Sequence, residues 1–179
     1  MSNYNITSRY ADAFTEFAED KSVYDKVVQD VELINNTLVG SRELRNFLSS
    51  PVLKETKKKE IIKAVFGDKI NDVTVRFLNF VVDKGRIEML HEIMQRFLEI
   101  RDKKENITDV TFKSVIELGD EQAKRIKAEM ETYTGKNVRF KNIVDKSLIG
   151  GYTAQIKDTV LDASVKRQLE RLKKTLIEE

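Results

Sequence analysis

Two glycine motifs are the first candidates for chemistry, because glycine-rich loops can hold phosphate groups. Gly150 and Gly151 are adjacent, but a phosphate-binding loop leads directly into the N-terminus of a helix. Here the next helical pattern begins only after a predicted hairpin. Gly135 and Lys136 resemble the end of a P-loop, yet Asn137 stands where Ser or Thr is needed. We therefore predict a structural turn at Gly150–Gly151 and no nucleotide site.

The titratable residues form no obvious catalytic set. Asp145 and Asp162 flank the predicted hairpin and could be an acid–base pair, but each is better explained as a turn or cap residue. His91 is the single histidine and cysteine is absent, so a zinc site would need carboxylates almost alone. A lone histidine is most often a surface residue. We predict no catalytic residue, no metal site and no cofactor.

The composition is that of a highly charged soluble protein. The 179 residues include 32 Lys and Arg and 30 Asp and Glu, with 40% hydrophobic residues and a net charge of +2. The two signs are balanced in both halves of the chain, unlike the basic face of a dedicated nucleic-acid binder. The longest segment without a charge, Ser147–Ile156, is too short to span a bilayer. The helical pattern begins within a few residues of Met1, so we expect no signal or transit peptide.

Residues 1–104 have helical periodicity throughout. Apolar residues recur every three or four positions, and breaks such as Gly40, Pro51 and Gly85 fall at predicted helix ends. Six predicted helices with short connections indicate a compact six-helix bundle. At the turn after Gly85, we expect Arg86 to pair with carbonyls or a nearby acidic residue and so fix the turn.

The pattern changes in residues 105–179. Between Ile107 and Leu118 apolar and polar residues alternate, which predicts a strand. A helix, a second strand, a hairpin over Tyr152–Leu161 and a closing helix follow, in the order β-α-β-β-β-α. This order predicts a small α/β sandwich, so the fold class is α plus α/β. The boundary between domains 1–104 and 105–179 falls at the charged segment Asp102–Asn106, which is either a linker or the frayed end of the sixth predicted helix.

Five segments in order along the whole chain resemble one family. They are RYADAF at Arg9–Phe14, the proline Pro51 after a short helix, DKGRIEML at Asp83–Leu90, DKSLIGG at Asp145–Gly151 and LDASVKRQL at Leu161–Leu169. On these segments the chain is identified as a member of the family of F-type ATP synthase delta subunits, called oligomycin-sensitivity-conferring protein in mitochondria. It departs from the family pattern at Phe14, Asn106 and Ala163.

The resemblance implies a structural role without an active site. Members of the family link the catalytic head to the peripheral stalk, so that the head does not rotate with the central rotor. It implies that the helical domain takes the N-terminal helix of an alpha subunit into a groove between its first and fifth helices. It also implies that the α/β domain holds the C-terminal end of the b stalk subunits. The expected setting is a hetero-oligomer, peripheral on the cytoplasmic face of the bacterial membrane, without membrane insertion or nucleic acid.

The residues make such a groove physically reasonable. The first predicted helix carries two apolar stripes and is apolar over more of its circumference than a surface helix needs. A groove for a helix needs apolar walls with aromatic anchors. The predicted groove residues are Tyr10, Ala13, Phe14, Phe17, Val73, Phe77 and Phe80. For each of them a place in the core is the alternative, and we expect Tyr10 and Phe80 to be exposed.

Two other classes of function stay open at this point. An RNA- or ribosome-associated two-domain adaptor would combine similar elements, and its signature would be a basic stripe with interleaved aromatic residues. The even distribution of charge argues against it. An enzyme would need convergent polar residues, and the sequence indicates none.

Overall fold

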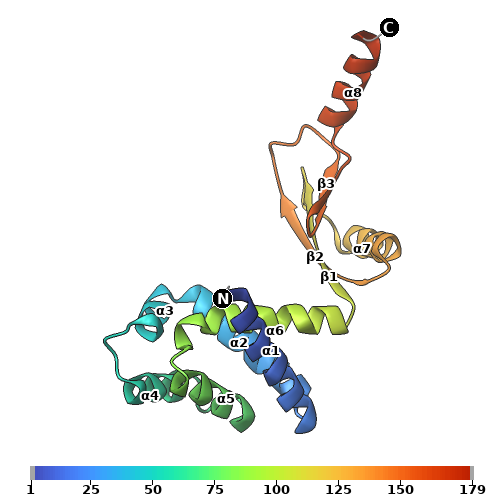
Figure 1. Ribbon diagram of the computed structural model, residues 1–179. Helices are drawn as coiled ribbons and strands as arrows, with labels where there is room; N and C mark the ends of the chain where they lie inside the picture. Colours follow the sequence, from blue (N-terminus) through green and yellow to red (C-terminus); the bar gives the residue numbers. More distant parts are fainter. Residues whose placement is uncertain (1–2, 178–179) are drawn as a thin grey trace. The chain divides into compact units, whose positions relative to one another are not determined.

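The computed structural model describes residues 3–177 and contains two compact units, Met1–Arg101 and Asp102–Glu179 (Figure 1). The first unit is helical and the second contains a four-stranded sheet. This combination of helices with a small mixed unit agrees with the predicted α plus α/β class. The charged segment at the predicted boundary is not an extended linker, because a helix continues through Lys104 and Asn106 then takes a positive φ of 54°.

The first unit is built from helices joined by short turns. They are α1 (Asn3–Asp20), α2 (Tyr24–Gly40), α3 (Arg42–Ser49), α4 (Glu55–Phe66), α5 (Asp72–Asp83), the 3-10 turn η1 (Ile87–Met89) and α6 (Leu90–Lys104). Side-chain caps define two of the helix starts. Ser41 Oγ accepts from the Leu44 N–H at the start of α3, and Asn71 Oδ1 accepts from the Val73 N–H at the start of α5.

The core of the first unit forms around the inner stripe of α1. Ala11, Phe14 and Ala18 are fully buried, as a two-stripe helix requires. The Phe14 ring stacks on Phe77 of α5 with centroids 3.8 Å apart, and it lies 5.2 Å from Phe97 of α6. Phe14 is therefore the centre of the contact between α1, α5 and α6.

A buried carboxylate fixes the start of α5. Asp30 of α2 accepts hydrogen bonds from the Asn71 N–H at 2.8 Å and from the Thr74 hydroxyl at 2.6 Å. Both Asp30 and Thr74 are buried, so these bonds compensate the removal of the carboxylate from water. The positive end of the α5 dipole adds to the attraction. The position of α5 is thus set by polar contacts as well as by packing.

The turn after α5 forms through the backbone rather than through the Arg86 side chain. Gly85 has a positive φ of 63°, and its N–H donates to the Val82 carbonyl at 2.8 Å. The Arg86 N–H donates to the Val81 carbonyl at 3.0 Å, which completes a Schellman-type helix end. The Arg86 side chain is exposed and has no hydrogen bond or ion pair within residues 3–177. Our prediction that it fixes the turn was wrong, because the backbone donors already satisfy the last carbonyls.

The second unit has the predicted order of elements. These are β1 (Ile107–Ser114), α7 (Asp120–Thr134), β2 (Asn137–Val144), β3 (Tyr152–Ile156), β4 (Thr159–Asp162) and α8 (Val165–Ile177). The strand order is β2-β1-β3-β4, with β1 parallel to β2 and the remaining pairs antiparallel. Figure 1 shows α7 beside this sheet, and its Met130 joins a small core with Val110, Phe112, Val138 and Ala154. The first strand ends at Ser114, before the predicted end at Leu118. The Ser114 hydroxyl donates a hydrogen bond to the Ile116 carbonyl at 2.6 Å, in the turn that follows the strand.

The glycine pair before β3 lies in a tight loop. Gly151 has a φ of 78°, and a Cβ on it would overlap the Ala163 carbonyl oxygen. The Gly150 carbonyl accepts from the Val165 N–H at 3.0 Å. The two glycines therefore let this loop lie directly against the start of α8.

Candidate functional site

The titratable residues that were considered for chemistry have structural surroundings. The Ser147 hydroxyl and N–H donate to Asp145 at 2.6 Å and 3.0 Å and lower the pKa of that carboxyl. Ser164 lowers the pKa of Asp162, first through its side chain and then through its N–H, which donates at 2.9 Å. Both aspartates thus serve as turn residues, as predicted. Within the described part of the chain, no three His, Cys, Asp or Glu residues are grouped to hold a metal ion.

His91 differs from the expectation of a surface residue. It is half-buried in the first turn of α6, and its Nδ1 is sealed from solvent without a hydrogen-bond partner in the described residues. Its neighbours Leu90 and Met94 on the same helix are buried, which places His91 at the boundary between core and surface.

The most aromatic hollow of the first unit lies between α1 and α5 and is here called the α1–α5 groove. Its volume is about 370 Å³, and it is lined by Ala13, Phe17, Arg76, Phe77 and Phe80. The two helices lie side by side and run antiparallel (Figure 1), since Tyr10 faces Phe80 while Phe14 faces Phe77.

The walls of the groove come from the outer stripe of α1 and one face of α5. Ala13 and Phe17 are exposed on the α1 side, where the small Ala13 side chain leaves room for another backbone. On the α5 side, Phe77 is nearly buried and forms the floor, while Phe80 is 47% exposed and forms the edge. Exposed aromatic rings around a small residue are the kind of surface that binds an apolar helix face.

The structure places the other predicted groove residues elsewhere. Phe14 is fully buried in the core, so its assignment to the groove was wrong; it shares the inner stripe with Ala11 and Ala18. Tyr10 is half-buried rather than exposed, and its ring supports Phe80 at 6.0 Å without lining the hollow. Val73 is half-buried in the first turn of α5, outside the lining.

The predicted groove residues did not include the basic residues that lie beside the groove. Arg76 lines the hollow directly. Lys84 Nζ lies 5.5 Å from the centre of the Phe80 ring, and Lys21 Nζ lies 6.0 Å from that of Phe17. Helical spacing could have indicated Arg76, because Arg76 is three residues after Val73 and four before Phe80 on the same helix.

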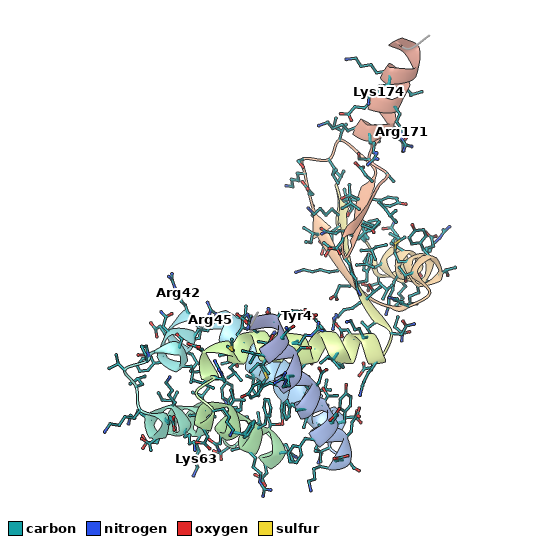
Figure 2. All side chains as sticks on the ribbon, in the orientation of Figure 1. Tyr4, Arg42, Arg45, Lys63, Arg171 and Lys174 are labelled. Carbon is teal, nitrogen blue, oxygen red and sulfur yellow. The ribbon has the colours of Figure 1, made fainter. Side chains whose placement is uncertain are left out.

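A second apolar surface lies on α8. Val165, Leu169 and Leu172 follow each other at helical spacing, and all three are exposed. The side chain of Leu176, at the next helical position of this stripe, lies outside the described residues. We expected a closing helix, but this stripe does not pack on the sheet; the core of the unit takes its helical contribution from α7. Figure 2 shows Arg171 and Lys174 on α8, whose polar positions are mostly basic.

Exposed apolar surfaces on both units place the chain in the class of proteins that associate with other proteins. The chain belongs to the ATP synthase delta (OSCP) subunit family, whose model matches residues 6–176. The family predicted from the sequence is confirmed. No helix in the described part of the chain is long and apolar enough to cross a membrane.

Individual members of this family are similar to the chain over nearly its full length. ATP synthase subunit delta of Chloroherpeton thalassium is 40% identical over 96% of this chain and 93% of its own length. The subunit of Chlorobium phaeobacteroides is 37% identical over 100% and 99%. The fold is similar to that of a chain in the cryo-EM structure of the Toxoplasma gondii mitochondrial ATP synthase hexamer. The TM-score is 0.69 at 24% identity, over 96% of this chain and 97% of that chain.

Proposed function

We propose that this chain holds the catalytic head of an F-type ATP synthase to its peripheral stalk through two separate apolar surfaces. The family membership makes it a peripheral-stalk subunit with a structural rather than a catalytic role. The single observation that carries the proposal is the apolar α1–α5 groove in a member of this family. In a bacterial cell the protein would be peripheral on the cytoplasmic face of the membrane, within the assembled synthase.

The first surface is proposed to take the N-terminal helix of an alpha subunit. The lining of α1 extends from Ala13 to Phe17 and the facing wall from Arg76 to Phe80. With Tyr10 beside Phe80, the walls span about two helical turns, roughly 10 Å. A guest helix with apolar residues at i, i+3 or i+4, and i+7 matches that length. Its backbone would come closest over Ala13.

The second surface is proposed to hold the C-terminal end of the b stalk subunits. The α8 stripe of Val165, Leu169 and Leu172 is an exposed apolar helix face of the kind that packs against another helix. Two attachments on different units suit a stator, because a single flexible contact would let the head turn with the rotor.

The groove assignment is tested by isothermal titration calorimetry of the full chain with a synthetic peptide of the alpha subunit N-terminus. We expect binding at micromolar concentration or tighter. Ala13→Glu should abolish it, because a charge would occupy the closest approach of the guest. Ala128→Glu, at an exposed alanine of α7, is the matched control and should leave binding unchanged. Absence of peptide binding together with retention on RNA would favour the alternative RNA-associated adaptor.

The α8 assignment needs its own experiment. Co-sedimentation of the full chain with the C-terminal segment of the b subunit should be lost for Leu169→Asp, which places a charge in the stripe. Val52→Asp is a suitable control, because Val52 is highly exposed in the first unit. If both variants sediment with b as the parent chain does, α8 is not the stalk-binding surface.

A further inference from the structure

An unpaired arginine lies in the otherwise apolar lining of the α1–α5 groove. Arg76 is exposed and makes no hydrogen bond or ion pair with the part of the chain that the structure describes. Four of the five lining residues are apolar, so this guanidinium is the charged group that a guest helix would meet.

Covering Arg76 has a cost that depends on the guest. A guanidinium that is taken out of water without a partner loses hydration, and this loss opposes binding. A carboxylate on the guest would compensate the loss with charge-assisted, bidentate hydrogen bonds, which arginine is well suited to form. The same residue therefore penalises a neutral or basic guest and favours an acidic one.

The charges around the groove distinguish its two edges. On the α5 edge, Lys84 lies over the Phe80 ring, and within residues 3–177 it makes no ion pair. Arg76 and Lys84 are eight positions apart, about 12 Å along a helix. On the α1 side the charges are mixed in sign, because Lys21 lies beside the Phe17 ring while Asp12 and Glu16 are exposed carboxylates. The carboxylate of Asp83, next to Lys84, is paired with Lys59, so Arg76 and Lys84 leave the α5 edge positive.

We propose that Arg76 is a specificity-determining residue of this groove. The groove takes an amphipathic helix that carries carboxylates along the edge facing α5, and one of these carboxylates pairs with Arg76. The second, about two turns along the guest, lies near Lys84. This inference rests on the proposed function, and it adds the charge pattern of the guest and which of its edges faces α5.

The experiment is a double-mutant cycle on the full chain, measured by calorimetry at low and high salt. The probe is the synthetic N-terminal peptide of the alpha subunit from the same organism, together with peptides in which each Glu or Asp is changed singly to Gln or Asn. The protein variants are Arg76→Gln, Arg76→Lys and the control Arg42→Gln. Figure 2 shows Arg42 on α3, away from the groove, and it too is an exposed arginine of the first unit.

Arg76→Gln should weaken binding of the unmodified peptide about threefold to tenfold at low salt, and less at high salt. One peptide variant should bind the parent protein more weakly than the unmodified peptide does, by a similar factor. The same peptide variant and the unmodified peptide should bind Arg76→Gln with equal affinity. Arg76→Lys should recover part of the affinity, and Arg42→Gln should change nothing. If the peptide binds but Arg76→Gln has no effect, or every pair of changes is additive, the inference is wrong while the groove assignment stands. If the parent protein does not bind the peptide, the proposed function fails as well.

Discussion

The most informative single change is Phe80→Asp at the edge of the α1–α5 groove. Phe80 is 47% exposed in the free chain, and an aromatic side chain can bury about 200 Å². A guest helix would therefore cover about 100 Å² of this ring, worth about 2.5 kcal/mol at 25 cal/mol per Å². That free energy corresponds to a loss of roughly 70-fold in affinity. The desolvation of the new carboxylate would increase the loss.

The fold should survive this substitution. Loss of the buried part of the Phe80 ring, including its contact with Tyr10 at 6.0 Å, should lower the unfolding free energy by about 1–2 kcal/mol. A carboxylate in the last turn of α5 adds a few tenths of a kcal/mol through the helix dipole. Phe47→Asp is a close control, because Phe47 is 53% exposed and also lies in the last turn of its helix, α3.

Two measurements decide the matter. Calorimetry with the alpha N-terminal peptide should show the large loss for Phe80→Asp and parental affinity for Phe47→Asp. Circular dichroism should show the same helix content in both variants. Equal affinities for the two variants would refute the groove assignment, and a loss of helix in Phe80→Asp would show that its ring belongs to the core.

Three further changes test the framework around these surfaces. Asp30→Ala should lower the unfolding free energy in urea by about 3 kcal/mol, since it leaves the buried Thr74 hydroxyl and the half-buried Asn71 N–H without their acceptor. Thr74→Val, which removes one of these donors, should cost less than half of that, and equal losses would contradict the account. Gly151→Ala should destabilise the second unit by more than about 2 kcal/mol, because a Cβ would overlap the backbone at a positive φ. Gly40→Ala is the control, because a Cβ there meets nothing within 4 Å, and it should be nearly neutral. Both glycine variants are measured by thermal unfolding. Deletion of residues 105–179 should leave a folded helical unit that binds the alpha peptide but not the stalk; failure of the truncated chain to fold would show that the domain division is misplaced.

The features that could be predicted from the sequence are those with local causes. The two stripes of α1 follow from helical periodicity, and the order of elements in the second unit follows from the change to a period of two. The glycine turns follow from the need for a positive φ or a close backbone approach at Gly85 and Gly151. These requirements are properties of short segments, so they can be recognised without knowing what packs against them.

The tertiary structure decided which apolar side chains are covered. Phe14 and Phe17 are three positions apart on one helix, and periodicity separates their directions without saying which one meets a neighbour. Phe14 is buried because the Phe77 ring of α5 stacks on it and the Phe97 ring of α6 packs against it at an angle, while Phe17 remains at the groove. In the same way, Leu169 is exposed because α7, not α8, packs into the core of the second unit. Burial depends on long-range contacts between elements, and those contacts form both the core and the surfaces left for partners.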